Sequence, residues 1–282
     1  MAKVRIVTDS TADIPKKIAE ELGIIVVPLK VSFGTEVYRD GVDITSAAFI
    51  SRLQEESTLP TTSQPSPGEF VAIYEKLIAK GDTIISIHIS GKLSGTMQSA
   101  QTAKTVTDSR DIYIIDSKSA SLGLGLIVIA AAKAAREDRS VHEILSMIKD
   151  KVDKSFILFL VETLDYLEKG GRIGKASALL GSLLKIKPIL TIDDEGQIIP
   201  LEKVRGTSKA LQRISQIVAE RIDNSIRYSW AMVYGNNYPG VIKLREQLLP
   251  LLKCENVLIN EIGPVITAHT GPGLIGVIVS PE

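Results

Sequence analysis

The sequence predicts an α/β protein with two domains. The N-terminal domain should have a mainly parallel sheet with flanking helices, and the C-terminal domain a mixed or antiparallel sheet with helices. In the first half, short β-branched runs alternate with helical patterns, as they do in βαβ units. In the second half, two strand-like runs flank Asp193-Asp194-Glu195-Gly196, which is typical of a β-hairpin. The pattern changes near residue 155, so we predict domains at residues 1–155 and 156–282.

Apolar runs and capping signals predict the elements of the first half. Near-continuous apolar runs, typical of buried parallel strands, lie at residues 4–8, 24–31, 83–89 and 111–115. Ser66 and Glu69 form a capping box that opens a helix, with Pro67 at its first position. Ser140 and Glu143 form a second capping box and predict another helix start.

The second half mixes strands with two helices. Strand-like runs occur at residues 156–161, 189–192, 197–201, 229–234, 257–262, 265–268 and 274–279. A short helix is expected over residues 164–169, where Gly170-Gly171 would end it. A long amphipathic helix is expected over residues 208–222.

Composition excludes several classes of protein. Lys plus Arg and Asp plus Glu both total 33, so the net charge is zero and a nucleic-acid-binding surface is not expected. Aromatic residues are only 5% although the mean hydropathy is +0.17, so the apolar content is mainly aliphatic. No apolar segment approaches the roughly 20 residues of a transmembrane helix. We therefore expect a soluble, cytoplasmic protein without a transmembrane segment.

Metal and cofactor motifs are not found in the sequence. Its single cysteine, Cys254, excludes an intramolecular disulfide, and its three histidines have no metal-ligand spacing, so neither a metal nor a cofactor is expected. Gly123-Leu124-Gly125 resembles the start of a dinucleotide-binding turn. Its third glycine position is Val128, however, which favours tight helix packing as the reason for the glycines.

Ser94-Gly95-Thr96 could form an anion site. The segment follows an apolar strand through a short loop and begins a helix, whose first N–H groups lack partners within the helix. Gly95 would let an anion approach the backbone, and the hydroxyl groups of Ser94 and Thr96 would add donors. The alternative is that Ser94 is only the N-cap of its own helix.

Two further turns are expected at the same edge of the sheet. Residues 61–68 form a hydroxyl-rich loop that includes Thr62 and Ser63, and residues 7–13 form another strand-to-helix turn. Helix starts that follow parallel strands gather at one edge of the sheet. We expect Asp13 to cap a helix, while Asp9 could either cap a helix or orient the neighbouring hydroxyl groups.

The second half offers arginines among glycines and one histidine. Arg172 and Arg205 lie beside glycines, where a guanidinium is usually exposed but can bind carboxylate or phosphate groups. His269 is expected at a strand end next to a tight turn. A single histidine is more often structural than functional, although the glycines after it would let a ligand approach.

With these segments in view, the chain resembles the DegV family of bacterial fatty-acid-binding proteins. The resemblance rests on collinear blocks along nearly the whole chain. They are VTDSTADIP at 7–15, TTSQPSPGEF at 61–70, LSGTMQSA at 93–100, ETLDYLEKGGRIG at 162–174, KIKPILTIDDEGQIIPLEKVRG at 185–206 and GPVITAHTGPG at 263–273.

The resemblance implies a two-domain α/β protein that holds one long-chain fatty acid, with the C-terminal domain closing over the acyl chain. It implies that the carboxylate is bound by Thr62, Ser63, Ser94, Gly95, Thr96 and His269. It further implies that a separate fatty acid kinase subunit phosphorylates the bound acid to an acyl phosphate for phospholipid synthesis. Arg172 and Arg205 would then face the kinase or the phosphate.

Departures from the family pattern are small. SGK at residues 90–92 lacks a second serine, Met97 stands where an aromatic residue is frequent, and Thr267 stands where glycine is common. They put the preferred chain length in doubt, not the carboxylate ligands.

The alternative function is a hydrolase that cleaves acyl esters with Ser94 as the nucleophile. Gly91-Lys92-Leu93-Ser94-Gly95 resembles the GxSxG elbow, but its serine is at the fourth position instead of the third. Asp116 and His269 would have to complete a triad with Ser94.

Overall fold

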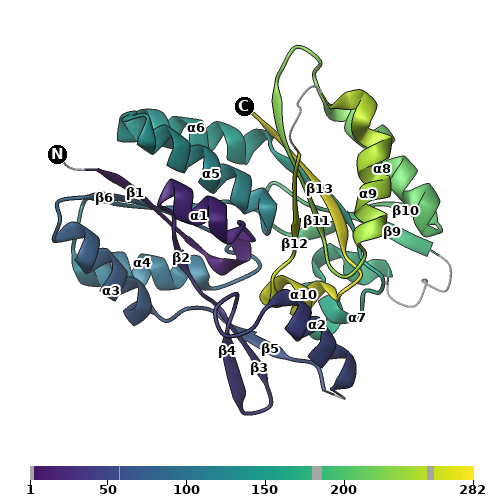
Figure 1. Cartoon of the computed structure of the whole chain (residues 1–282), viewed down its shortest axis with the longest axis horizontal. Helices are drawn as coiled ribbons and strands as arrows, with labels where there is room; N and C mark the ends of the chain where they lie inside the picture. The colour runs from purple at the N-terminus through teal and green to yellow at the C-terminus, as the bar shows by residue number, and fades with distance from the viewer. Residues whose placement is uncertain (1–2, 57, 180–185, 253–256) are drawn as a thin grey trace.

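A four-stranded parallel sheet forms the N-terminal part of the protein in this computed structural model, which describes residues 3–56, 58–179, 186–252 and 257–282. Its strand order is β2 (Ile25–Val27), β1 (Val4–Asp9), β6 (Thr83–His88) and β7 (Ile112–Asp116). The helices around it are α1 (Lys16–Leu22), α3 (Pro67–Ile78), α4 (Thr96–Thr107), α5 (Leu122–Arg136) and α6 (Val141–Lys154). Figure 1 shows α5 and α6 above the sheet and α3 and α4 below it.

Both faces of this sheet are covered, as the continuous apolar runs predicted. Val7 and Ile84 pack against α3 and α4, whereas their neighbours Ile6 and Ile85 belong to the cluster that includes α5 and α6. Side chains alternate between the faces of a strand, so a strand buried on both faces must be apolar throughout.

The two capping boxes are confirmed. At α3 the Ser66 N–H donates to Glu69, and at α6 the Ser140 N–H donates to Glu143, at 2.8 and 2.9 Å. At α1 the prediction is wrong, because Pro15 occupies the N-cap position and Asp13 does not cap the helix. Asp13 instead lies buried with its carboxylate turned to other elements.

Residues 24–63 differ most from the prediction. The single strand expected over residues 24–31 is divided, since β2 ends before Pro28, which has no N–H to donate within a sheet. The chain then builds a small antiparallel sheet of order β4 (Glu36–Arg39), β3 (Lys30–Phe33) and β5 (Thr61–Ser63), with α2 (Ser46–Glu55) between its strands in sequence.

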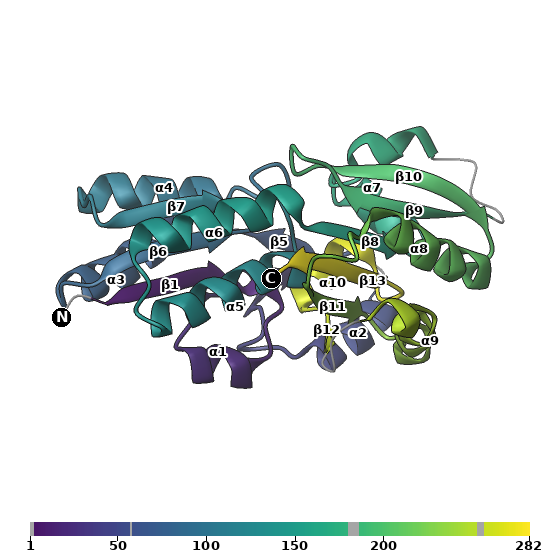
Figure 2. The same cartoon turned by 90° about the horizontal axis from the view of Figure 1, so that it is seen from above.

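A six-stranded mixed sheet forms the C-terminal part (Figure 2). Its order is β10 (Ile198–Arg205), β9 (Ile186–Ile192), β8 (Phe156–Leu160), β13 (Ile275–Pro281), β11 (Tyr228–Tyr234) and β12 (Leu258–Glu261). The predicted hairpin is confirmed, because β9 and β10 pair antiparallel on either side of the Asp193–Gln197 turn. Helices α8 (Thr207–Arg221) and α9 (Tyr238–Leu248) cover one face, and α5 packs on the other.

Two short helices lie near the junction of the sheets. Helix α7 (Asp165–Lys169) ends at Gly170 as predicted. The strand expected over residues 265–268 is wrong, because this segment lies in helix α10 (Pro264–Thr270), with proline at its first position. His269 therefore lies in the last turn of a helix.

The largest core cluster includes residues from both halves of the chain, for example Leu124 of α5 and Phe159 of β8. The first strand of the six-stranded sheet in sequence, β8, begins at Phe156. The domain boundary between residues 155 and 156 stays a prediction. Cys254 lies outside the described residues. Within the described parts of the chain, no helix is long and apolar enough to cross a membrane.

The glycines at the start of α5 allow close packing, as predicted. A Cβ on Gly125 would lie 2.5 Å from the carbonyl oxygen of Ala12, which is too close for any real contact. We expect Gly125→Ala to lower the free energy of unfolding by about 1–3 kcal/mol, since backbone must move to admit the methyl group.

Gly68 in the first turn of α3 is the matched control. Its Cβ would meet nothing closer than Ser66 Oγ at 4.0 Å. Gly68→Ala should therefore leave stability unchanged or raise it by up to about 1 kcal/mol. Urea unfolding measures both variants, and equal effects would contradict the packing role of Gly125.

Candidate functional site

An apolar cavity lies where the parallel sheet, the small sheet, α10 and the six-stranded sheet meet. It encloses about 840 Å³ of space not filled by protein atoms, including its opening to solvent. Aliphatic and aromatic side chains from several elements form most of its lining, among them Ile89, Phe159, Val233, Ile266 and Leu274. The lining also contains an amide, a guanidinium and an imidazole, from Gln64, Arg172 and His269 respectively.

Thr62 and His269 meet in the wall of this cavity, although they are 207 residues apart in sequence. Thr62 Oγ1 and His269 Nε2 are 2.7 Å apart. Strand β5 places Thr62 opposite Val31 of β3, and α10 carries His269 in its last turn. Thr62, which was expected in a loop, and His269, which was expected at a strand end, therefore form one hydrogen-bonded pair.

The His269 ring is neutral at neutral pH. Burial, together with the nearby positive charge of Arg172, lowers the pKa of His269 to about 4. Nδ1 is buried with no hydrogen-bond partner among the described residues. A buried N–H without a partner is rarer than a buried acceptor without one. We therefore assign Nδ1 as the unprotonated nitrogen and place the ring proton on Nε2. Nε2 then donates to Thr62, and the Thr62 hydroxyl is left to donate elsewhere.

Ser94 lines the cavity from the loop between β6 and α4. Its hydroxyl lies 2.9 Å from Thr96 Oγ1 and accepts a hydrogen bond of 3.3 Å from the Thr96 N–H. The N-cap position of α4 is Gly95 and not Ser94. Ser94 is therefore not the N-cap that one interpretation of the sequence expected, although it bonds to the start of its helix; anion binding by this segment stays a prediction.

Gln64 is a lining residue that the sequence did not single out. A Cβ on Gly95 would lie 2.6–2.8 Å from the Gln64 side-chain amide, so the glycine admits this side chain. A glutamine after two hydroxyl residues gives no local signal of a site. Only the packing of β5 against the start of α4 reveals it.

Arg172 is half-buried in the cavity wall, which corrects the expectation that its glycine neighbours leave it exposed. Its Nε donates to the Leu93 carbonyl at 3.0 Å and its Nη1 to the Gly170 carbonyl at 2.8 Å. A Cβ on Gly170 would lie 2.4 Å from His269 Nδ1, so this turn packs directly on the histidine. Arg172 therefore joins the Ser94 loop to the turn that supports His269.

The remaining predicted site residues lie apart from the cavity or behind its wall. Ser63 is exposed, and Arg205 is exposed at the end of β10; neither lines the cavity. Thr96 is fully buried beneath Ser94. Of the predicted residues, the structure brings Thr62, Ser94, Arg172 and His269 into one cavity wall, and their roles stay predictions.

Comparison with protein families decides the membership of the chain. A family model described as "uncharacterised protein, DegV family" matches residues 3–282. The chain belongs to the DegV family. A DegV domain-containing protein of Halalkalibacterium halodurans is 41% identical over 277 residues, which are 98% of each chain.

Solved structures of DegV proteins share the fold. A DegV family protein from Thermus thermophilus, described as fatty acid binding, has a TM-score of 0.94 at 37% identity and covers 99% of this chain and 100% of its own. A stearic acid-binding protein from Eubacterium ventriosum has a TM-score of 0.89 at 29% identity and covers 100% of this chain and 98% of its own.

Asp9 connects β1 to the Ser94 loop of this DegV chain. It accepts hydrogen bonds from the Thr11 N–H and the Ile89 N–H, both at 3.1 Å. His88 Nδ1 lies 2.9 Å from the same carboxylate, and its Nε2 lies 2.7 Å from Ser86. Asp9 thus caps the short helix after β1, which is one of the two roles that the sequence left open, and it also holds the residue after β6 through a backbone N–H.

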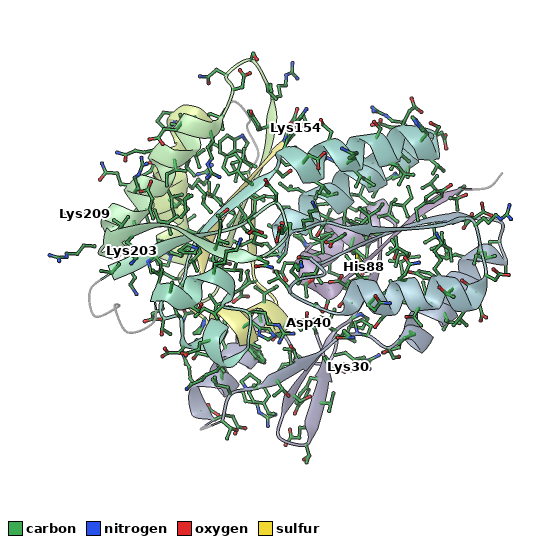
Figure 3. The ribbon with its side chains drawn as sticks, turned by 180° about the vertical axis from the view of Figure 1, so that it is seen from behind. Lys30, Asp40, His88, Lys154, Lys203 and Lys209 are labelled. Atoms are coloured by element: carbon green, nitrogen blue, oxygen red, sulfur yellow. The ribbon has the colours of Figure 1, made fainter. Side chains whose placement is uncertain are left out.

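Asp13 and Asp40 meet the start of α10. Asp13 accepts hydrogen bonds from the Ser121 hydroxyl and, at 2.9 Å, from the Gly263 N–H. A Cβ on Gly263 would lie 2.8 Å from Asp13 and 3.2 Å from Asp40, so both carboxylates face the same helix start. Figure 3 labels Asp40 beside α10 and His88 within the parallel sheet. The spacing of these residues in sequence gives no sign that they meet.

The DegV chain shows no hydrolytic triad in its described residues. Ser94 bonds to Thr96, His269 bonds to Thr62, and Asp116 accepts from the backbone N–H groups of Gly91 and Lys118. A serine nucleophile needs a base within hydrogen-bond reach. Across the described residues, no group of three or more His, Cys, Asp or Glu side chains is placed to hold a metal ion.

Asp40 should make the stability of the protein depend on pH. Burial raises the pKa of Asp40 to about 6 from 3.8. Between these values the folded state binds more protons than the unfolded chain, so this contribution to stability falls as pH rises. Asp40→Asn should remove this pH-dependent contribution. Between pH 4 and 7, the unfolding free energy of the variant should therefore fall less than that of the native protein, by up to about 3 kcal/mol.

Urea unfolding of both proteins across this pH range measures the difference. Asp43→Asn is the control, because Asp43 is a less buried carboxylate whose pKa is lowered to about 2 by hydrogen bonds from Arg39. If the native protein and Asp40→Asn show the same pH dependence, ionisation of Asp40 does not carry the effect.

Proposed function

We propose that this protein binds one long-chain fatty acid in the cavity described above, with its carboxylate at the polar groups of Thr62, Ser94 and His269. The observation that carries the proposal is a largely apolar cavity whose polar side chains are brought together from β5, the β6–α4 loop, α10 and the turn after α7. Solved relatives described as fatty acid binding and stearic acid-binding support the same class of ligand.

The energetics suit a long acyl chain. Each buried CH₂ group contributes about 0.8 kcal/mol, so a chain of about 16 carbons has ample nominal affinity before the cost of ordering is subtracted. The carboxylate must be met by donors or by positive charge, because an uncompensated buried anion is costly. The Thr62 and Ser94 hydroxyls supply donors, and the half-buried guanidinium of Arg172 supplies charge.

The neutral state of His269 gives the Thr62 hydroxyl a direction. Because Nε2 donates to Thr62 Oγ1, the hydroxyl proton can point to a carboxylate in the cavity. The family resemblance also assigns the N–H groups of Gly95 and Thr96 to the carboxylate site, although the Thr96 N–H already donates to Ser94 Oγ at 3.3 Å. Ser63 was included in that site by resemblance, but its exposed position gives it no support.

We further propose that the protein presents its fatty acid to a separate kinase subunit, which forms an acyl phosphate for phospholipid synthesis. The support is the family resemblance together with the place of the two arginines. Arg172 lies in the cavity wall beside His269, and Arg205 is exposed where β10 ends. This protein would then supply no catalytic residue of its own.

Native mass spectrometry of the purified protein tests fatty acid binding. We expect a mass increment equal to one long-chain fatty acid, either as purified or after incubation with hexadecanoic acid. Thr62→Val and Ser94→Ala should each lower the affinity about tenfold, because each removes a donor to a buried carboxylate.

Ser63→Ala is the matched control, since it removes a neighbouring but exposed hydroxyl, and it should retain the ligand. A protein that shows no increment after incubation with the acid would contradict the proposed function. Equal losses in Thr62→Val and Ser63→Ala would contradict the proposed place of the carboxylate.

Arg205→Ala tests the kinase proposal. The variant should keep its fatty acid but lose at least about 90% of ATP-dependent acyl phosphate formation by a bacterial fatty acid kinase subunit, because a charge in contact with a partner is removed. Lys154→Ala is the control, because Lys154 is an exposed lysine at the end of α6. Figure 3 shows it well apart from Lys203 and Lys209, which flank Arg205 in sequence.

Arg172→Ala is less decisive, because its bonds to Leu93 and Gly170 support the cavity wall. An Arg205→Ala variant that is phosphorylated as fast as the native protein would overturn the role of this residue.

A further inference from the structure

A second, polar cavity adjoins the apolar cavity of the proposed fatty acid site, which we call the acyl cavity. It also encloses about 840 Å³ including its opening to solvent, and most of its lining is polar. The charged and hydroxyl-bearing residues that line it include Ser117, Lys118, Ser119, Asp153, Asp193 and Asp194. We call it the polar cleft. Ile157 and Ile192 are the two residues that line both cavities.

Ile157 and Ile192 lie side by side on neighbouring strands. Strands β8 and β9 pair antiparallel with Leu158 opposite Thr191, and the same register places Ile157 opposite Ile192. Residues directly opposite in a sheet project on the same face, with Cβ atoms about 5 Å apart. Ile157 is 7% exposed and Ile192 is half-buried. The two side chains therefore form one partition between the cavities.

The partition separates the acyl cavity from the polar cleft, whereas the rest of the apolar wall is backed by packed core. Phe159, Val233 and Leu274 line the acyl cavity but not the polar cleft, and all three are at most 4% exposed within the main core cluster. A close-packed core has no room for extra atoms. Behind the isoleucine pair there is open space, so loss of a side chain there joins two cavities instead of enlarging one.

We propose that the Ile157–Ile192 pair determines ligand specificity by closing the acyl cavity against the polar cleft, so that only chains with an apolar end are accepted. This inference rests on the proposed fatty acid binding. In the native protein a hydroxyl at the far end of the chain would be buried among apolar side chains without a partner, which is costly. Such ligands are therefore excluded.

Opening the partition should reverse this exclusion for a neutral polar group. In Ile192→Ala, a terminal hydroxyl can reach the hydroxyl groups and water of the polar cleft. A terminal carboxylate gains less, because Asp153, Asp193 and Asp194 outnumber the one lysine in the lining named above. The chemistry thus distinguishes an ω-hydroxy fatty acid from an α,ω-dicarboxylic acid.

The test compares 16-hydroxyhexadecanoic acid with hexadecanoic acid. Calorimetry on delipidated protein gives the ratio of the two dissociation constants. In the native protein the hydroxy acid should bind at least about tenfold more weakly, and in Ile192→Ala this ratio should fall by about tenfold. Hexadecanedioic acid should show a smaller gain.

Ile198→Ala is the matched control. Ile198 pairs directly with Ile192 across β9 and β10, and it lines the acyl cavity but not the polar cleft. The same substitution there removes the same atoms from the acyl cavity without opening it. The ratio in Ile198→Ala should stay within about threefold of the native value.

The outcomes separate the two proposals. A native protein that binds neither acid overturns the fatty acid function itself. Native binding of hexadecanoic acid with an unchanged ratio in Ile192→Ala, or an equal change in Ile198→Ala, overturns the partition alone. If Ile192→Ala does not fold, as a melting curve would show, Ile192→Val and Ile157→Val decide: a smaller shift in the same direction supports the partition, and no shift overturns it.

Discussion

The carboxylate of Asp13 holds together the two helices on which the cavity depends. It receives the Ser121 hydroxyl at the start of α5 and the Gly263 N–H at the start of α10. Both helix starts carry lining residues, Ser121 on one side and Val265 and Ile266 on the other. Moving α10 would separate His269 from Thr62, so the polar end of the cavity depends on a residue that does not line it.

This arrangement is costly because the acids are buried. Burial raises the pKa of Asp13 well above its usual value, and Asp40 and Asp9 add like charge nearby. Asp40 keeps one oxygen without a partner among the described residues. Backbone N–H groups at a helix start favour anions and offset part of this cost. Buried acids with shifted pKa values are frequent at functional sites, where position matters more than stability.

Much of the fold could be predicted from local patterns, whereas the site could only in part. Capping boxes at Ser66 and Ser140 and the hairpin at Asp193 are short-range signals, and the structure agrees with them. The short strand β5 and the seven-residue helix α10 are too brief for any periodicity to show. The bond between Thr62 and His269 depends on both, and therefore could be expected only from resemblance. Gln64, Asp13 and Asp40 gave no signal because their partners are distant in sequence.

The place of β13 in the six-stranded sheet has a consequence for the order of folding. This strand, late in the chain, lies between β8 and β11 and is antiparallel to both. Without it the sheet falls into two pieces, β10-β9-β8 and β11-β12. During synthesis the parallel sheet can form early, because domains emerge from their N-terminal side. The wall of the cavity that contains Leu274 can form only after this residue and β13 have left the ribosome, so the proposed ligand cannot be enclosed before β13 joins β8 and β11.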